Sequence, residues 1–266
     1  MSEALTLTTL RDMGGKSSVV ATMLVVVVTA CTPAPPPYES RYVPPSPTSP
    51  PPPPLSPGAS FVDDFNRPDT ETGLGAAWDM RGAEIVANPI LPPATDGLIR
   101  DGQFVASGDS SVYAVREFRG AVRRIGAEGR WTRVGNGGEE TFVMAVSANE
   151  KLRTDMVHFS VTPTGWGVST RRNGGVARYV IGGKFDPPLG LDHSYRFEMD
   201  IADGSVTVRV PGMERKGRAG TIGLVGNRAF WQLYPSPRQV PLGVKFSADM
   251  VWVAEENQPL SPLPSA

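Results

Sequence analysis

The sequence predicts an all-β domain, an antiparallel sandwich or barrel that follows a signal peptide and a disordered proline-rich linker. Two observations predict this fold. From residue 60 to residue 256, turn residues divide the chain into short segments in which apolar and polar side chains alternate. In the same region no window is long enough to repeat its apolar residues with the period of a helix. Many short antiparallel strands without helices are typical of sandwiches and barrels.

The predicted strands occupy residues 103–107, 111–115, 129–134, 141–147, 156–162, 165–170, 176–181, 194–201, 205–210, 221–225 and 245–253. Alternation is clearest in residues 194–201, where Tyr195, Phe197 and Met199 point one way and the charged residues between them point the other. Turns rich in glycine, proline and asparagine separate the strands. Residues 230–234 are expected to form one turn of helix.

The composition limits the classes of partner. The chain has 266 residues with 26 basic and 27 acidic side chains, which gives a formal charge of −1. Nucleic-acid-binding domains usually carry a basic excess, so we expect no nucleic-acid partner. Cys31 is the only cysteine, which excludes an internal disulfide. About 195 residues remain after the leader and linker, enough for one domain with an ordinary core.

The first element in chain order is an uncharged apolar segment, residues 17–30, which ends just before Cys31. Its 14 residues are too few for a transmembrane helix, which needs about 20. They suit the core of a signal peptide preceded by Lys16. Either Met1 or Met13 starts this leader, and the residues after Met13 also match an N-myristoylation signal.

Val28-Thr29-Ala30-Cys31 resembles a bacterial lipobox. The resemblance implies that residues 1–30 are a lipoprotein signal peptide, that the chain is cleaved before Cys31, and that Cys31 is diacylated. The protein would then be extracytoplasmic and anchored to the cell membrane by its lipid. A cysteine that follows an apolar run by chance is the alternative.

Residues 31–59 are the predicted linker, and more than half of residues 33–57 are proline. Proline fixes φ and lacks a backbone donor, so this segment is expected to be extended polyproline II. At about 3.1 Å per residue its reach is on the order of 75 Å. We interpret it as a stalk that holds the domain away from the membrane. A docking ligand for a proline-recognising partner is the alternative.

Five segments resemble laminin-G-like, concanavalin A-like jelly rolls: residues 61–67, 74–79, 193–212, 220–224 and 246–253. They are similar to the family's opening, its late hairpin with the following strand, and its closing strand. The resemblance implies a jelly-roll β-sandwich over residues 60–256, followed by a disordered tail at 257–266. It implies a fold and no single activity, because that fold carries lectins, hydrolases, lyases and inert modules.

Residues 198–203, Glu-Met-Asp-Ile-Ala-Asp, are similar to the Glu-x-Asp-x-x-Glu catalytic strand of laminarinase-type glucanases. Retaining glycosidases need two carboxyl groups about 5–5.5 Å apart, which neighbours on one strand face supply. Here the last position is the shorter Asp203, and the flanking residues match the family's later hairpin instead. We therefore expect Glu198 and Asp200 to lie on a solvent-exposed strand face, and we predict no catalytic residue.

A second similarity is to alginate lyases, whose strands residues 116–119 and 156–158 loosely resemble. Proton abstraction beside a uronate needs a neutralising group, which Met156 cannot supply. His158 is therefore expected to be structural. His158 and His193 are the only histidines, and no cysteine cluster accompanies them, so we expect no zinc site.

Asp63, Asp64 and Asp249 are the candidate metal ligands. The first and last strands of jelly rolls usually lie side by side, and some related sugar-binding modules hold calcium near there. Calcium prefers hard oxygen ligands such as carboxylates. The resemblance thus makes a calcium site one hypothesis for these residues. The alternative is a polar strand edge without metal, and no other cofactor is expected.

Trp166 and Arg171 are the candidate ligand-binding residues. Aromatic rings suited to stacking on sugars, and arginines suited to hydroxyl or acidic groups, are Trp166, Trp231, Tyr179, Tyr234, Arg171, Arg172 and Arg178. Because Arg178 and Tyr179 are adjacent on one strand, only one of them can line a groove. Trp166 lies between two glycines that would leave its ring uncovered. We therefore expect it to be the stacking platform, with Arg171 beyond the strand end as the polar contact.

Taken together, these features predict a lipoprotein that presents a carbohydrate-binding module to cell-envelope or external polysaccharide. One alternative is a polysaccharide-active enzyme of glucanase or lyase type on the same fold. Another is a non-catalytic structural domain of the envelope. A facing pair of carboxylates in the concave sheet would favour the enzyme, and exposed aromatic residues on that face would favour binding.

Overall fold

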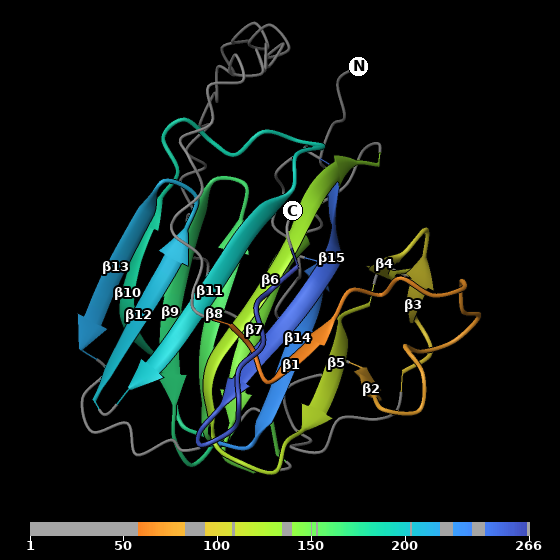
Figure 1. Cartoon of the computed structure of the whole chain (residues 1–266). Helices are drawn as coiled ribbons and strands as arrows, with labels where there is room; N and C mark the ends of the chain where they lie inside the picture. The colour runs from red at the N-terminus through yellow and green to blue at the C-terminus, as the bar shows by residue number, and fades with distance from the viewer. Residues whose placement is uncertain are drawn as a thin grey trace, which may run out of the picture. The chain divides into compact units, whose positions relative to one another are not determined.

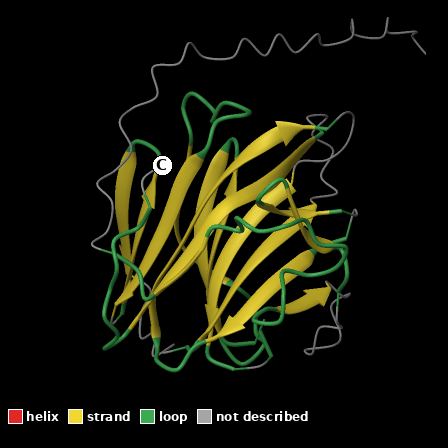
Figure 2. Ribbon diagram, turned by 45° about the vertical axis from the view of Figure 1, so that its right-hand side comes forward, coloured by secondary structure: helices red, strands yellow, loops and turns green. Residues whose placement is uncertain are grey.

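Figure 1 shows the computed structural model, which describes residues 58–82, 94–107, 110–134, 140–149, 151–152, 154–202, 204–218, 226–235 and 243–264. The leader, Cys31, nearly all of the linker and the predicted strand 221–225 lie outside these residues. The described residues form fifteen β-strands, and no helix among them is long and apolar enough to cross a membrane. The strands make two antiparallel sheets (Figures 1 and 2), so the predicted β-sandwich is confirmed.

One sheet, named sheet 1, contains the first and last strands. Its members are β1 (Phe61–Asp63), β3 (Gly97–Arg100), β4 (Gln103–Ala106), β6 (Val122–Arg133), β11 (Tyr195–Ala202), β12 (Ser205–Val210), β13 (Met213–Arg218) and β15 (Val244–Glu255). They lie in the order β13-β12-β11-β6-β15-β4-β3, and β1 pairs with β15. The two longest strands, β6 and β15, pair with each other in the middle of the sheet.

The other sheet, named sheet 2, is formed by the middle of the chain. Its members are β2 (Asp79–Gly82), β5 (Val112–Glu117), β7 (Glu140–Ser147), β8 (Met156–Thr162), β9 (Gly165–Arg171), β10 (Arg178–Lys184) and β14 (Arg228–Pro235). They lie in the order β10-β9-β8-β7-β14-β5-β2. Three successive hairpins, β7 to β10, therefore make up one half of this sheet.

Large aromatic side chains fill the space between the sheets. Trp131, Phe142 and Phe246 come from β6, β7 and β15, and all three are buried. The ring centroid of Phe246 lies 4.2 Å from that of Phe142 and 4.6 Å from that of Trp131. These contacts join the two sheets directly. Alternation supplies the rest of the core, because every second residue of strands such as β12 is buried.

The prediction for residues 230–234 is wrong. They are the middle of β14, which pairs with both β5 and β7. Trp231 and Leu233 point into the core, whereas Phe230 and Gln232 point to the opposite face and are also buried. With both faces covered, the segment shows no clear alternation of apolar and polar residues, so the pattern does not reveal a strand.

Most other predicted strands agree closely with the structure. Residues 156–162 and 205–210 coincide with β8 and β12, and the remaining described predictions differ by one to three residues at one or both ends or, in β6, by more. The short strands β1, β2 and β3 and the charged β13 are additional to those predicted. Each is too short or too polar to show an alternation of its own.

The two ends of the described chain meet on the outer face of sheet 1. Ala59 forms a bridge with Ser261, and Leu263 packs against a small cluster that contains Trp252. Arg196 also donates a hydrogen bond to the carbonyl of Pro264 (3.0 Å). Residues up to 264 thus belong to the described structure, although the sequence predicts a disordered tail over 257–266.

Candidate functional site

The outer face of sheet 2 is turned away from the core. Its residues are mostly buried and apolar on the middle strands and polar and partly exposed toward β10. Two neighbouring rows of paired residues cross all seven strands from β10 to β2: Tyr179, Ser169, His158, Ala145, Phe230, Val115 and Asp79, and Gly182, Gly167, Ser160, Val143, Gln232, Tyr113 and Arg81. On β7, β14 and β5 these residues are buried and mostly apolar. On β8, β9 and β10 they are polar or glycine and partly exposed.

Tyr179 is the more exposed of two accessible aromatic side chains on the described part of this face, with 71% of its surface accessible against 41% for Tyr234 of β14. Its ring lies over two glycines of the second row. A Cβ on Gly167 would be 3.7 Å from Cε2 of Tyr179, and a Cβ on Gly182 would be 2.6 Å from its hydroxyl. Because the glycines have no side chains, the ring rests on the backbone of the sheet. The other side of the ring remains open to solvent.

A β-bulge decides which residues of β10 face outward. Tyr179 pairs with Ser169, but the next pair is Ile181 with Val168, so the register shifts between them. Simple alternation would place Tyr179 and Ile181 on one face. Instead Tyr179 lies on the outer face, while Val180 and Ile181 both pack against the core. The additional residue reverses the alternation, as a bulge does.

Two serine hydroxyl groups lie on the neighbouring strands β9 and β8 on the same face as this ring. The Oγ of Ser169 lies 3.0 Å from Nε2 and 3.1 Å from Nδ1 of His158, and the Oγ of Ser160 donates to the carbonyl of Gly167 (3.3 Å). Each hydroxyl can both donate and accept, as recognition of a sugar hydroxyl requires. Arg171 is two residues beyond Ser169 on the same face of β9, so the structure brings it to the same region.

The structure places Trp166 elsewhere. Only 7% of it is exposed, and its ring contacts Phe159 inside the core with centroids 6.2 Å apart. The expectation that neighbouring glycines leave the ring uncovered is wrong, because the ring points between the sheets. Gly183 covers it from β10, where a Cβ would be 3.1 Å from Nε1 of Trp166. The accessible platform is Tyr179, which sequence reasoning passed over.

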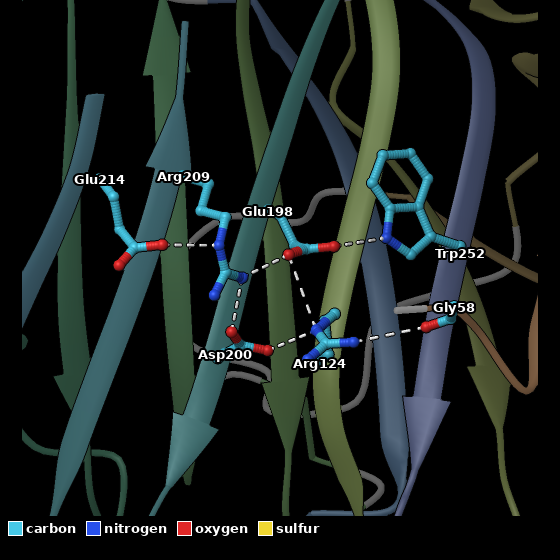
Figure 3. Close-up of polar contacts among 7 residues, drawn as sticks. All are labelled: Gly58, Arg124, Glu198, Asp200, Arg209, Glu214 and Trp252. Carbon is cyan, nitrogen blue, oxygen red and sulfur yellow. Dashed lines mark hydrogen bonds and ion pairs between the residues drawn. The ribbon is translucent and has the colours of Figure 1, made fainter. Parts of the chain in front are cut away.

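The outer face of sheet 1 is organised around a row of charged groups (Figure 3). Glu214, Arg209, Glu198, Gly126 and Trp252 are successive partners across β13, β12, β11, β6 and β15. The indole of Trp252 crosses the glycine, and its Nε1 donates to Oε2 of Glu198 (3.0 Å). A Cβ on Gly126 would overlap the indole ring, so glycine is required there.

Two arginines hold the carboxylates of Glu198 and Asp200. Nη1 of Arg209 donates to Oε1 of Glu198 (2.5 Å) and to Oδ2 of Asp200 (2.6 Å). Nε of Arg124 donates to Oδ1 of Asp200 (2.5 Å). Burial acts to lower the pKa of Arg209, but hydrogen bonds and charge from Asp200 and then Glu198 raise it above its ordinary value. Arg209 is therefore a permanent cation at the centre of this group.

This arrangement corrects the expectation for Glu198 and Asp200. They do not form a simple solvated strand face, because Glu198 is 5% exposed and both carboxylates are engaged by arginine. A catalytic carboxyl must reach the substrate, and the arginines that bind this pair restrict that access.

The strands of sheet 2 carry two acids on the described part of the outer face, Asp79 on β2 and Glu117 on β5, and each forms an ion pair with an arginine. Along the two rows that cross the sheet, Asp79 is the only acid, and it lies on the edge strand β2. Nε of Arg81 donates to its Oδ2 at 2.8 Å. On the middle strands the corresponding positions are Ala145, Val143 and uncharged residues of β14. The described part of this face is suited to contact with a ligand through stacking and hydroxyl groups.

Asp63, a predicted calcium ligand, binds protein groups instead. Its carboxylate accepts from the backbone N–H of Phe65 (2.9 Å), from Nη1 and Nη2 of Arg67 (2.6 and 3.0 Å) and from Nε1 of Trp78 (2.9 Å). Burial raises the pKa of Asp63, but these bonds, led by that from Arg67, outweigh burial and bring the pKa below its ordinary value of 3.8. Asp63 therefore ties β1 to the loop that precedes β2.

The structure does not bring the three predicted calcium ligands together. Asp64 accepts from the backbone N–H of Asn66 (3.1 Å) on the surface. Asp249 belongs to a separate group, accepting from Gln103 (2.5 Å), Ser194 (2.7 Å) and Arg130 (2.8 Å). Among the described residues no three His, Cys, Asp or Glu side chains are grouped to hold a metal ion. This geometry gives the calcium prediction no support.

Three solved glucanases have a similar fold. Bacillus licheniformis beta-glucanase matches with a TM-score of 0.50 and 12% identity, over 76% of this chain and 100% of the glucanase. A non-specific endo-beta-1,3(4)-glucanase of family GH16 matches with a TM-score of 0.52 and 10% identity, over 76% and 93%. The catalytic domain of an endo-1,3-beta-glucanase (laminarinase) from Thermotoga petrophila matches with 0.51 and 10%, over 75% and 98%.

These comparisons show that the chain has a concanavalin A-like jelly-roll fold. At identities this low they show the fold alone. No protein-family model and no curated protein matches the sequence.

The bonds of Asp63 predict a pH-dependent stability. Asp63→Asn should lower the free energy of unfolding at neutral pH by about 2 kcal/mol, because the charge-assisted hydrogen bonds from Arg67 to the carboxylate are lost. The pKa of Asp63 is lowered in the folded state, so its contribution is complete above about pH 4 and disappears as pH falls through the folded pKa. Urea unfolding at neutral pH and at about pH 3 measures this.

Asp64→Asn is the matched control, because Asp64 is exposed and accepts a single backbone hydrogen bond among the described residues. We expect it to change stability little at either pH. Wild type and Asp63→Asn could instead differ in free energy of unfolding by the same amount at both pH values. That result would show that the ionised carboxylate is not the stabilising group.

Proposed function

We propose that this protein is a membrane-anchored extracytoplasmic lipoprotein whose jelly-roll domain binds polysaccharide without cleaving it. The observation that carries the proposal is the exposed ring of Tyr179, supported by Gly167 and Gly182 on the outer face of sheet 2. A flat aromatic side chain with hydroxyl groups beside it is suited to the apolar face and polar edge of a sugar ring. The fold is compatible with this function, since polysaccharide-active proteins share it.

A polysaccharide-active enzyme is the second candidate. The fold similarity to glucanases favours it, because their names state that they act on glucans. The positions of the acids weigh against it. Glu198 and Asp200 are held by Arg124 and Arg209, and the middle strands of sheet 2 present no carboxylate pair among the described residues. Binding therefore accounts for the described side chains better than hydrolysis does.

Truncation of the platform tests the proposal. Tyr179→Ala should weaken binding of the full chain to the glycan that it binds best on an array by about thirtyfold, the typical loss at an aromatic hot spot. Because Tyr179 is exposed, the variant should remain folded, with unchanged near-ultraviolet circular dichroism. Tyr179→Phe keeps the ring and serves as the control, so it should retain most of the affinity. Equal affinity of wild type and Tyr179→Ala would contradict the platform.

The lipid anchor has its own test. The apolar segment that ends at Cys31 supports acylation of that cysteine. In a bacterial host, Cys31→Ser should leave the protein unlipidated, so that it moves from the detergent phase to the aqueous phase on partitioning. If the variant partitions as the wild type does, the anchor does not depend on Cys31.

A further inference from the structure

The edge strands β10 and β13 lie against each other on the same side of the sandwich (Figure 1). Each is the last strand of its sheet in the described structure. Gly217 of β13 makes the close approach possible, since a Cβ there would be 2.9 Å from Ile181 and 3.0 Å from Val180. The two strands together form one narrow surface, named the β10–β13 edge.

This edge has an excess of positive charge. Its exposed cations are Arg178 and Lys184 on β10 and Arg215, Lys216 and Arg218 on β13. The acid of the two strands is Glu214, and its carboxylate is bound by Nε of Arg209 at 2.8 Å. Five cations therefore accompany one acid that is already paired with a sixth cation. The chain as a whole has a net charge of −1, so the excess is local.

Many arginines elsewhere on the described surface form ion pairs, although Arg119, Arg133 and Arg172 have none with a described acid. Those that form ion pairs with acids are Arg67, Arg81, Arg100, Arg123, Arg124, Arg130, Arg196, Arg209 and Arg228. None of the ion pairs among the described residues involves Arg178, Lys184, Lys216 or Arg218. The carboxylates that neutralise cations elsewhere are missing from the described part of this edge, which leaves a field suited to an external anion.

We infer that the β10–β13 edge binds an anionic polysaccharide, one with carboxylate, sulfate or phosphate groups along its chain. The inference rests on the proposed function and specifies its ligand class. Tyr179 is itself on β10, but it lies on the outer face of sheet 2. Lys216 and Arg218 instead share the outer face of sheet 1 with Arg209. A glycan that contacts both must therefore cross the β10–β13 edge. A sugar unit on Tyr179 places the following units of the same chain along the charged edge. Arginine and lysine then bind the acidic groups through charge-assisted hydrogen bonds.

Charged residues on edge strands also have a simpler role, which is to prevent sheets of two molecules from pairing. That role needs charge of any sign and gives no preference for an anionic ligand. It predicts that removal of the cations causes self-association and leaves affinity for glycans unchanged. The two roles can therefore be separated by measuring binding and oligomeric state in the same variants.

The test compares polygalacturonate, which is anionic, with laminarin, which is neutral, by isothermal titration calorimetry on the full chain. We expect wild type to bind polygalacturonate at least tenfold more tightly at low ionic strength, and we expect high salt to remove this preference. Lys216→Gln combined with Arg218→Gln should weaken binding to polygalacturonate by about tenfold and leave binding to laminarin unchanged.

The matched control is Arg81→Gln combined with Arg100→Gln. It removes the same charge from β2 and β3, the opposite edge strands of the two sheets, and should leave both affinities unchanged. An equal loss in both double variants would overturn the inference, because the effect would then follow net charge alone. The Lys216→Gln and Arg218→Gln double variant could also self-associate in ultracentrifugation while keeping its affinity for polygalacturonate. That result would show that the cations only prevent pairing of sheet edges, and it would overturn the inference as well.

Three further outcomes have distinct meanings. Laminarin bound as tightly as polygalacturonate would overturn the anionic ligand and leave the proposed function intact. Polygalacturonate bound equally by wild type and Tyr179→Ala would contradict the stacking platform while the charged edge stands. Tighter binding to single-stranded DNA or to phosphatidylserine vesicles than to polygalacturonate would assign the edge to another class of partner and overturn the inference.

Discussion

The hydrogen bond from Trp252 to Glu198, made across Gly126, connects the middle of sheet 1. It fixes a carboxylate on β11, and that carboxylate in turn holds Arg209 on β12. Five adjacent strands thus share one row of contacts, and the two ends of the described chain cover the tryptophan. Removal of both acids would leave Arg124 without a carboxylate partner among the described residues and leave Glu214 to bind Arg209, which is unfavourable. The acidic pair that resembles a catalytic motif is therefore a structural group.

With sheet 1 occupied in this way, sheet 2 has the outer face that can meet a ligand. Its polar half is formed by consecutive hairpins, and its edge strand carries the one bulge of the sheet between Tyr179 and Ile181. The bulge turns two apolar side chains of β10 into the core and leaves the tyrosine outside. The glycines opposite the ring allow it to lie flat. The exposure of Tyr179 on this face follows from a local break in the alternation that builds the rest of the sandwich.

The sequence is sufficient to predict the fold class and many strands, because a strand with one covered face shows its period directly, as residues 194–201 do. It is insufficient for β14, whose two faces are both buried. It is also insufficient for the platform: the same alternation that predicts strands places Tyr179 with Ile181, and a bulge has no clear signal in composition. The role of Asp63 depends on Trp78, and a hydrogen bond between segments that far apart in sequence cannot be read from spacing.

The central claim is that a glycan lies on the outer face of sheet 2 at Tyr179. Mapping of backbone amide shifts by nuclear magnetic resonance, during titration of the full chain with galacturonate oligosaccharides, tests it most directly. The account predicts that the largest shifts are at Tyr179, Gly167, Gly182 and Ser160, with smaller shifts on β13 and none near Trp252. Shifts centred on Glu198 and Trp252 in sheet 1, with β8 to β10 unaffected, would contradict it.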